Sequence, residues 1–522
     1  MKKIRIEEMT LEQKLNFVLC MRRYRNEDDI SYIVDLVKKR SVGAIQIPPN
    51  RPDIMKRVRE AADYPIIIAC DMEQGFPTSD KPKVQELALA ATRDMKYIRS
   101  FTKGIVSDAM AAGYNCVWSP VVDVLVGNKP CTVYRCFSDD AEKISLCAEE
   151  MCKVFSENHF LMSCKHYPGG QDIPVDTHIS NRPSERSKED LINLDLRPYA
   201  HLIERGMLDT IMVGHHFFPK IDPDYPATLS KKVMDIIREM GFDGVAFTDS
   251  FAMMSILQNF GEEKIYGMSL AAGNDVILPN YRTEPRLTYE YLRKNFEDGM
   301  FTEERLDEAV RRILKAQDYV AEMKENSCEF TEEDAEILAS VFRDAICAVC
   351  DPDVNLALGE DSEKRAFVIL TEVGFSKDSD KEEIATGEWY DPIRCEERIK
   401  ENFPKAGVFF MSEYPNANDN QHLLNGLTKY DEVVFITFCN TTAYLGSDCL
   451  TRRAENIING VIYTGKVSAV VHFGNPYALE ELEHTPRSIF GFLSPESQKY
   501  SIDVLAGKLE AKGTMPINLN LK

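Results

Sequence analysis

Short apolar runs that alternate with helical patterns constrain the fold of this chain more than any other feature of its sequence. Seven such runs, rich in Val, Ile and Phe, occur at 42–47, 65–71, 115–120, 161–167, 210–215, 244–251 and 275–278. Continuous apolar runs between amphipathic helices are typical of parallel strands covered on both faces. About seven β/α units over roughly 300 residues favour a (β/α)8 TIM-type barrel over an open doubly wound sheet, and no Gly-rich dinucleotide fingerprint follows the first run. The sequence therefore predicts an α/β protein that begins with such a barrel.

A second, smaller domain is expected after the barrel. The helical pattern at 302–324, which begins with a Thr-x-x-Arg cap, is followed by a polar stretch and closes the first domain. Further apolar runs separated by helical patterns indicate a second α/β unit, and they lie at 366–370, 407–411, 432–439 and 467–473. We therefore expect a TIM barrel at 1–325, a linker at 326–345 and a C-terminal α/β sandwich domain at 346–522.

Charge and cysteine usage limit the partners and the location. The 84 acidic and 62 basic residues give a formal net charge of −22, so neither nucleic acid nor an anionic membrane surface is expected as a partner. The N-terminus is charged, and no run of about 18 uncharged apolar residues occurs, so we expect neither a signal peptide nor a membrane span and assign the chain to the cytoplasm. The 14 cysteines are scattered. We expect them to be buried thiols, including both members of Cys347-x-x-Cys350.

Polar residues stand where several predicted strands end. In a barrel the active site is collected at the carboxyl ends of the strands, so these residues are expected to form one rim. Some of them end an apolar run directly and others lie in the loops before or after a run. In chain order they are Asp71, Arg135, Lys165, His166, Asp176, His178, His215 and Asp249.

Asp249 and His178 are the candidates for chemistry at this rim. A strand-end carboxylate can act as a nucleophile and a loop imidazole as a proton shuttle, provided that a neighbour such as Asp176 orients the imidazole. A lone strand-end Asp more often caps the following helix, but the convergence of charged residues here favours a site. Lys165 also allows a Schiff-base lysine of the kind found in barrel aldolases, although the adjacent His166 suits polar sugar recognition at least as well.

Other polar and aromatic residues are given simpler interpretations. His215 and His216 could suggest a metal pair, but adjacent strand residues point to opposite faces, so only one is expected to enter the site. We expect no metal and no cofactor. Trp118 and Phe76 could stack on a sugar ring, although apolar residues on strands more often pack in the core.

The motifs around these residues occur in a fixed order along the chain. Lys165-His166-Tyr-Pro-Gly169 followed by Asp176-Thr-His178 has the spacing of Lys-His-Phe-Pro-Gly-His-Gly…Asp-Ser-His. Others are Asp71-Met-Glu73, Arg135-Cys-Phe137, Thr248-Asp249-Ser and Ala272-Gly-Asn-Asp275, with Phe473-Gly-Asn-Pro476 and Gly513-Thr-Met-Pro516 in the second domain. Together they resemble the two-domain form of glycoside hydrolase family 3, of the β-N-acetylhexosaminidase type.

The resemblance implies a role for each rim residue. Asp249 falls on the nucleophile that forms a glycosyl-enzyme ester, His178 on the acid/base, and Asp176 on the carboxylate paired with that histidine. A retaining glycosidase needs one ionised carboxylate and one proton carrier, and a histidine in the second role avoids two neighbouring negative charges. Substrate-binding positions fall on Asp71, Arg135, Lys165, His166 and His215.

Two segments depart from the family pattern. Pro-Gly-His-Gly becomes Pro168-Gly169-Gly170-Gln171, and two arginines expected near Phe76 and Ser79 are missing. We therefore expect a small carbohydrate substrate whose outer groups are held differently. The expected function is a retaining hydrolase that releases terminal β-linked N-acetylglucosamine. The alternatives are a family 3 β-glucosidase, an N-acetylglucosaminide phosphorylase, and a degenerate sugar-binding protein; retention of Asp176, His178 and Asp249 argues against the last.

Overall fold

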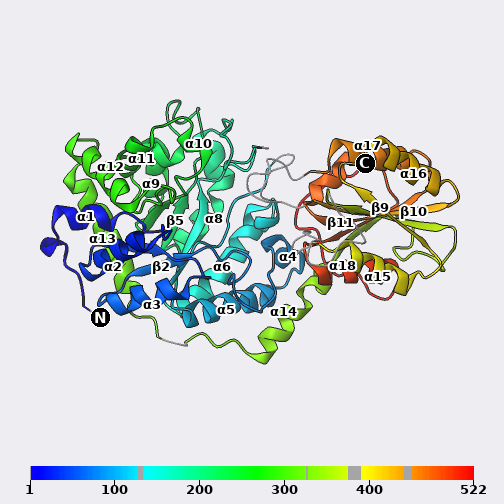
Figure 1. The fold of residues 1–522 in the computed structure, drawn as a ribbon, viewed down its shortest axis with the longest axis horizontal. Helices are drawn as coiled ribbons and strands as arrows, with labels where there is room; N and C mark the ends of the chain where they lie inside the picture. Colours follow the sequence, from blue (N-terminus) through cyan, green and yellow to red (C-terminus); the bar gives the residue numbers. More distant parts are fainter. Residues whose placement is uncertain (1, 127–132, 174, 325–326, 374–389, 440–448) are drawn as a thin grey trace. The chain divides into compact units, whose positions relative to one another are not determined.

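The computed structural model describes residues 2–126, 133–173, 175–324, 327–373, 390–439 and 449–522. Packing divides the chain into two compact units, the first made mainly of residues up to Leu338 and the second of Ala339–Lys522 together with Leu87–Asp94. The described residues form two six-stranded sheets, one in each unit (Figure 1).

The first sheet is parallel throughout, and its strands follow one another in chain order. They are β1 (Ala44–Gln46), β2 (Ile67–Cys70), β3 (Cys116–Val117), β4 (Leu161–Tyr167), β5 (Thr210–Val213) and β6 (Val245–Thr248). Two further segments join its edges through parallel bridges between Leu19 and Ile277, Met21 and Ile45, and Phe247 and Val276. Eight parallel segments thus close into a ring, which confirms the predicted (β/α)8 TIM-type barrel.

The segment around Leu19 is the barrel strand that the sequence pattern does not reveal. Helix α1 (Leu11–Phe17) buries Leu15 and Phe17, and the chain runs from its end directly into the buried residues Val18 and Leu19. Helix and strand therefore form one continuous apolar run, in which neither periodicity stands out.

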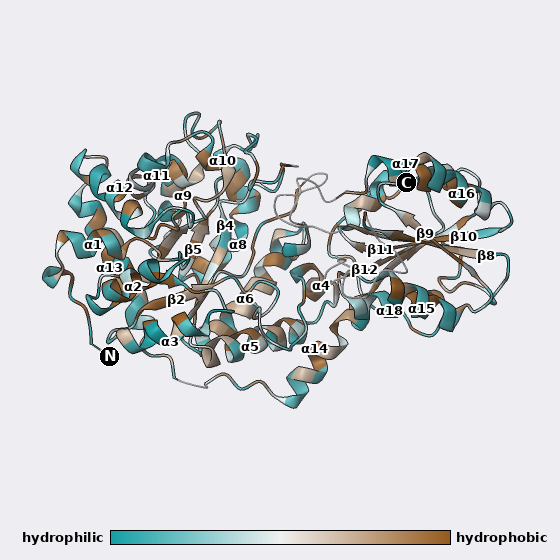
Figure 2. Cartoon of the chain, in the orientation of Figure 1, coloured by the Kyte–Doolittle hydropathy of each residue, from teal (hydrophilic) through white to brown (hydrophobic). Residues whose placement is uncertain are grey.

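Helices of the first unit pack around the barrel and link its strands. The helices of the first 344 residues after α1 are α2 (Glu27–Lys38), α3 (Pro52–Ala61), α4 (Glu86–Ala91), α5 (Met95–Ala111), α6 (Ala141–Glu157), α7 (Lys188–Asp190), α8 (Arg197–Glu204), α9 (Lys231–Glu239), α10 (Met254–Leu257), α11 (Glu262–Ala272), α12 (Pro285–Glu297), α13 (Glu303–Val320) and α14 (Glu332–Asp344). Figure 2 shows hydrophobic residues gathered on the strands and on the helix sides that face them. None of the helices in the described residues combines the length and the apolar character needed to cross a bilayer.

Helix α14 lies inside the stretch at 326–345 that the sequence assigns to a linker. Its first turn is tied to α5, because Asp334 accepts hydrogen bonds from Ser100 Oγ at 2.8 Å and from Lys103 Nζ at 3.0 Å. Thr331 caps the helix and donates to the same carboxylate. The domain boundaries at 325 and 346 stay a prediction.

The second unit is a sandwich of helices around an open sheet, with the strand order β7-β12-β11-β10-β8-β9. The strands are β7 (Cys347–Cys350), β8 (Arg365–Thr371), β9 (Gly407–Ser412), β10 (Glu432–Cys439), β11 (Val467–Gly474) and β12 (Arg487–Gly491); the helices are α15 (Pro392–Asn402), α16 (Ala417–Leu427), α17 (Arg452–Ile462) and α18 (Pro495–Leu505). All pairs are parallel except β7 with β12. The predicted strands correspond to β8 to β11.

Edge strand β7 corrects one expectation about the cysteines. Cys347 is buried, but Cys350 is exposed, because β7 pairs on one side only and its end lies at the margin of the sheet. Cys328 and Cys449 are also partly exposed. The other cysteines within the described residues are buried.

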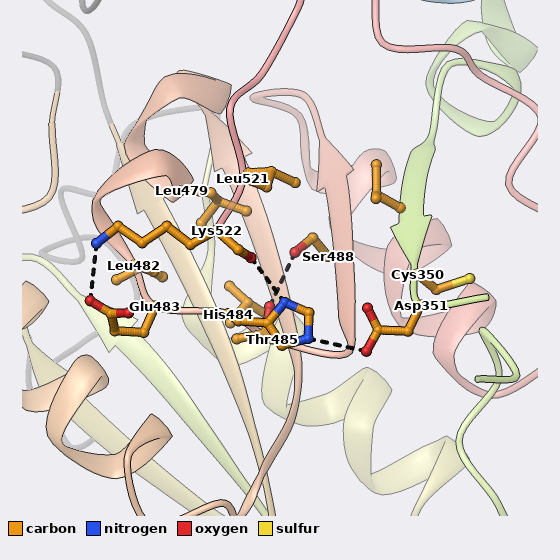
Figure 3. A pocket seen from close by; sticks show the side chains of 12 residues that line it. Cys350, Asp351, Leu479, Leu482, Glu483, His484, Thr485, Ser488, Leu521 and Lys522 are labelled. Carbon is orange, nitrogen blue, oxygen red and sulfur yellow. Dashed lines mark hydrogen bonds and ion pairs between the residues drawn. The ribbon is translucent and has the colours of Figure 1, made fainter. Parts of the chain in front are cut away.

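A pocket of about 200 Å³ lies beside β7 and β12 (Figure 3). At its centre His484 pairs through Nε2 with Asp351 at 3.1 Å, and its Nδ1 lies 2.9 Å from the carbonyl oxygen of Lys522. The Lys522 ammonium lies 3.0 Å from Glu483. The polar groups of this pocket thus bind one another and hold Lys522 against the sheet.

Candidate active site

The residues predicted for the site gather at the carboxyl end of the barrel. Asp71 follows β2 directly, Lys165 and His166 lie at the end of β4, and Asp249 follows β6. Arg135 closes the short helical turn Val133–Arg135, in the connection between β3 and β4. Since parallel strands of a barrel all end on the same side, these side chains share one rim.

An ion-pair network ties several of these residues together. The ammonium of Lys165 lies 2.9 Å from Asp71 Oδ1 and 2.5 Å from Glu73 Oε1. Arg135 donates two hydrogen bonds to Glu73, of 2.7 Å from Nε and 2.6 Å from Nη2. Burial raises the pKa of Glu73, but Arg135 and Lys165 outweigh it and hold that pKa well below its usual range. Glu73 therefore stays ionised between the two cations. It was not among the predicted site residues, although it lies two residues after Asp71.

Lys165 is held in its charged form. Burial lowers the pKa of its ammonium, but the carboxylates of Asp71 and Glu73 outweigh burial and raise the pKa above the usual value. A Schiff-base lysine must lose its proton before it can attack a carbonyl group. The aldolase alternative therefore fits this environment poorly, whereas a fixed cationic hydrogen-bond donor fits it well.

His166 is oriented by Asp123, a second residue outside the predicted set. Asp123 accepts the backbone N–H of His166 at 2.8 Å through Oδ1, and its Oδ2 lies 2.9 Å from His166 Nδ1. Burial raises the pKa of the Asp123 carboxyl, but the contact with His166 outweighs burial and lowers that pKa. The imidazole proton then lies on Nδ1, so that Nε2, 3.4 Å from Arg135 Nη2, is left as an acceptor. The only sequence signal for Asp123 is one acid inside an apolar run.

Asp249 has the environment of an ionised nucleophile. Its backbone N–H donates to Val213 O at 2.8 Å, and its Oδ1 accepts the N–H of Ser250 at 2.6 Å. Burial raises the pKa of this carboxyl, but nearby imidazoles, those of His166 and His215 first, outweigh it and lower the pKa to about 2. Asp249 therefore carries a full negative charge at neutral pH.

His178 is paired with Asp176 in the loop after β4. Its Nδ1 lies 2.8 Å from Asp176 Oδ1, which also accepts the backbone N–H of His178 at 2.8 Å. The carbonyl of His178 accepts the N–H of Met254 at 3.1 Å, at the start of α10. Since Met254 is five residues beyond Asp249, this contact brings the loop to the end of β6. The His178 ring is also among the groups that lower the pKa of Asp249.

His215 supports the turn that carries Asp249. Its Nε2 lies 3.1 Å from the carbonyl of Ser250, its Nδ1 lies 2.7 Å from Thr228 Oγ1, and its ring stacks on Phe251 at 5.3 Å. Burial lowers the pKa of His215, and Nε2 donates to Ser250, because a carbonyl oxygen can only accept. Both ring nitrogens thus contact protein groups, and the substrate-binding role of His215 stays a prediction.

His216 is also buried at this end of the barrel, and the expectation that only one of the two adjacent histidines enters the site stays a prediction. Strand β5 ends at Val213, so the following residues no longer alternate between two faces. Burial lowers the pKa of His216 to about 4, and the charges of Asp123 and Asp249 act on its ring.

Arg22 is a further rim residue. Its Nη1 donates to Ser250 Oγ at 2.9 Å, and its guanidinium lies over the ring of Tyr281, 5.3 Å from the ring centre. Arg22 follows the barrel segment around Leu19, which the sequence pattern does not reveal. Its position on the rim could therefore not be predicted.

The two aromatic candidates belong to the core. Trp118 packs edge-on against Phe247 and Phe76 against Tyr114, and both are buried. This agrees with the simpler interpretation of the sequence. Among the side chains that the structure describes, no three from His, Cys, Asp and Glu are grouped to hold a metal ion.

Comparison with known sequences places these residues in a family context. A model of the N-terminal domain of glycosyl hydrolase family 3 matches residues 10–316. A β-N-acetylglucosaminidase/β-glucosidase from Cellulomonas fimi is 26% identical over 329 residues, which cover 59% of this chain and 57% of that protein. A β-hexosaminidase from Xanthomonas oryzae pv. oryzae is 29% identical over 244 residues, which cover 43% of this chain and 70% of that protein. The chain thus matches little more than half the length of the Cellulomonas protein.

Solved structures match both units of the fold. A family 3 β-N-acetylglucosaminidase from Paenibacillus sp. str. FPU-7 has a TM-score of 0.77 at 22% identity, and the match covers 98% of this chain and 100% of that one. The β-glucoside phosphorylase BglX has a TM-score of 0.80 at 20% identity, with 98% and 94% covered. At these identities the likeness shows the fold, and it confirms a barrel followed by an α/β sandwich.

Proposed function

Because the chain belongs to glycosyl hydrolase family 3, we propose that it is a retaining glycosidase that releases terminal β-linked N-acetylglucosamine through a glycosyl ester of Asp249. The observation that carries the proposal is the pairing of an ionised carboxylate, Asp249, with a carboxylate-supported imidazole, His178, at one end of the barrel. The names of the Cellulomonas, Xanthomonas and Paenibacillus proteins support an amino-sugar substrate.

In the first step a carboxylate oxygen of Asp249 attacks the anomeric carbon of the bound sugar. The glycosidic C–O bond breaks, and Nε2 of the His178 imidazolium gives its proton to the departing oxygen. Asp176 binds Nδ1–H, so the ring keeps its orientation and its positive charge is stabilised before transfer. The products of this step are the free alcohol and the glycosyl ester.

In the second step a water molecule attacks the same carbon from the face that the alcohol left. The neutral His178 takes a proton from the water, the ester bond breaks, and Asp249 regains its charge. Two inversions give net retention of the β configuration. The contact between Ser250 N–H and Asp249 Oδ1 keeps the carboxylate aimed in both steps.

The ion-pair network supplies the groups that hold the terminal sugar. Lys165 and Arg135 donate hydrogen bonds to hydroxyl groups, and His166 Nε2 and Asp71 accept them. The side chain of Asp71 is 57% exposed although it pairs with Lys165, so one side of its carboxylate faces solvent and can bind substrate. A site built from such groups discriminates strongly against analogues that lack the matching hydroxyl groups.

Phosphorolysis of a β-linked sugar is the second candidate function. The likeness to a β-glucoside phosphorylase motivates it. A histidine acid/base also puts less negative charge beside an incoming phosphate than a second carboxylate would, since the neutral ring repels no anion. In that case phosphate replaces water in the second step, and the product is a sugar 1-phosphate.

The test is a panel of nitrophenyl β-glycosides, assayed with and without phosphate, with Asp249→Asn as the control for contaminating enzymes. We expect kcat/KM to favour the N-acetylglucosaminide over the glucoside by at least about tenfold, the modest discrimination that contacts to one substituent provide. Equal or reversed preference would favour a β-glucosidase. A sugar 1-phosphate formed faster than free sugar would favour a phosphorylase, and turnover of no glycoside would leave the sugar-binding alternative.

A further inference from the structure

The segment Gly169–Gln171 departs from the family motif, and the structure gives a reason for the first change. The family motif has His where this chain has Gly170, whose φ of +106° favours glycine. A Cβ at this position would lie 3.0 Å from Phe218 Cζ and 3.4 Å from the ring of His216. The rings of Phe218 and His216 thus crowd the space beside Gly170, and a side chain at 170 would require them to shift.

The second change places an amide beside the residue that orients His166. The 121–125 segment runs parallel to this part of the chain, with bridges from Val121 to Lys165 and from Leu125 to Gln171. Asp123 lies between the two bridges. Gln171 Nε2 donates to Asp123 Oδ2 at 3.0 Å, the same oxygen that lies 2.9 Å from His166 Nδ1. The side chain of Asp123 is fully buried, that of His166 is 11% exposed, and Gln171 is 6% exposed.

We propose that Gln171 is a positioning residue for sugar binding, which acts through Asp123 to fix the tautomer and the orientation of His166. This inference rests on the proposed function, in which His166 Nε2 accepts a hydrogen bond from the terminal sugar. The amide of Gln171 holds Asp123 Oδ2 in the line of the His166 Nδ1–H bond. A buried carboxylate that loses such a donor must find another partner. The Asp123 carboxylate then turns away from His166, or the His166 ring moves with it.

Two substitutions remove the donor in different ways. Gln171→Met keeps the length and volume of the side chain but donates no hydrogen bond. Gln171→Glu keeps the shape, and its carboxyl can donate to Asp123 only when it is protonated, which acidic pH favours. The charged and titratable groups around this position include Asp123, His166, Asp172, Arg186, Asp195, His216 and Asp249.

A matched control is available elsewhere in the barrel. Gln317 is 2% exposed, and its Nε2 donates to the carbonyl of Gly43 at 2.9 Å. Gln317→Met therefore removes a glutamine donor of equal burial without touching the rim. It separates loss of stability from loss of positioning.

We expect Gln171→Met to raise KM for the preferred nitrophenyl glycoside by about tenfold, because one hydrogen bond to a charged group typically contributes a free energy of about that size. The change in kcat should be less than about threefold. Gln317→Met should change neither constant. The ratio of KM between Gln171→Glu and the unsubstituted protein should fall towards one as the pH is lowered. The proposal is overturned if KM is unchanged in Gln171→Met or rises equally in Gln317→Met. It is also overturned if the KM ratio for Gln171→Glu does not vary with pH.

A measurement that needs no turnover separates this proposal from the proposed function. Ring ¹⁵N shifts of labelled histidine, with His166 assigned through His166→Gln, report which nitrogen carries the proton. We expect Nδ1 to carry it in the unsubstituted protein and a mixture of tautomers in Gln171→Met. If no glycoside is turned over but the tautomer changes as expected, the proposed function fails and the positioning role stands. If glycosides are turned over and the tautomer is the same in both proteins, the positioning role fails alone.

Discussion

At the scale of the residue, the charge of Asp249 decides whether the site can form a covalent intermediate. Asp249→Asn keeps an oxygen that can accept the Ser250 N–H, but an amide is too weak a nucleophile to form the ester. We expect kcat/KM on a dinitrophenyl glycoside to fall by at least about three orders of magnitude. The melting temperature should stay within a few degrees. An Asn variant with near-normal rates would show that another group is the nucleophile.

The contribution of the His178 imidazole to the rate is expected to be larger for poorer leaving groups. A poor leaving group needs a proton from the Asp176-supported ring, whereas dinitrophenolate departs without one. We expect His178→Ala to lose about 10²- to 10⁴-fold in kcat/KM on an alkyl glycoside but much less on the dinitrophenyl glycoside. Equal losses on the two substrates would assign His178 to positioning rather than to proton transfer.

Which site residues could be predicted follows from how they reach the rim. Lys165, His166 and Asp249 end apolar runs, and parallel strands bring such ends together, so the sequence pattern was sufficient. Asp123 and Glu73 do not end apolar runs in this way, so the strand-end argument does not predict them. Their roles become visible only from the residues that they bind. Arg22 was out of reach because its strand is hidden in the run that begins in α1.

At the scale of the element, α14 is anchored by one carboxylate. Burial raises the pKa of Asp334, but the N–H of Thr331 and the donors on α5 outweigh it and lower the pKa to about 2, from the usual 3.8. A carboxyl with a lowered pKa in the folded state stabilises that state above pH 4, and the stabilisation is lost as the pH falls towards 2. The difference corresponds to about 2 kcal/mol at neutral pH.

We therefore expect Asp334→Asn to reduce hydrogen-exchange protection in the first turn of α14 by about tenfold or more at pH 7. The difference should narrow towards pH 2, where about half of the Asp334 carboxyl is protonated, and it should vanish at lower pH. Equal protection at pH 7 would mean that the anchor contributes nothing, and that α14 is held by its apolar contacts alone.

Strand β7 was missed by the sequence pattern for a physical reason. The predicted strands β8, β10 and β11 are long and mostly buried, as expected for strands covered by helices on both faces, whereas β9 is apolar in sequence but only partly buried. Strand β7 is four residues long and lies at the edge of its sheet, and Val349 and Cys350 are exposed. Short edge strands bury too little surface to carry a continuous apolar run, so pairing rather than composition defines them.

At the scale of the whole molecule, a fully buried carboxylate lies at the start of the segment that closes the barrel. Asp275 is 0% exposed, and its oxygens lie 2.9 Å from Arg238, 2.6 Å from Arg305 and 3.3 Å from Arg312. Its Oδ2 also accepts the N–H of Ala246 in β6 at 3.0 Å. One side chain thus joins α9, α13 and β6 where the segment at 275–278 enters the ring.

Asp275→Asn should be among the most destabilising single substitutions in the barrel. The amide accepts from Ala246 but cannot balance the three guanidinium groups, and loss of one partner of a buried ionic network costs about 3–5 kcal/mol. Urea unfolding measures the change in the free energy of unfolding. Hydrogen exchange of peptides from β6 and 275–278 then shows whether protection is lost where the barrel closes. The control is Asp243→Asn: Asp243 is 71% exposed and pairs with Arg312 and Lys315 at 3.4 Å, so its loss should cost no more than about 1 kcal/mol. Similar small effects of both substitutions would show that backbone pairing of the last segment closes the barrel without the arginine network.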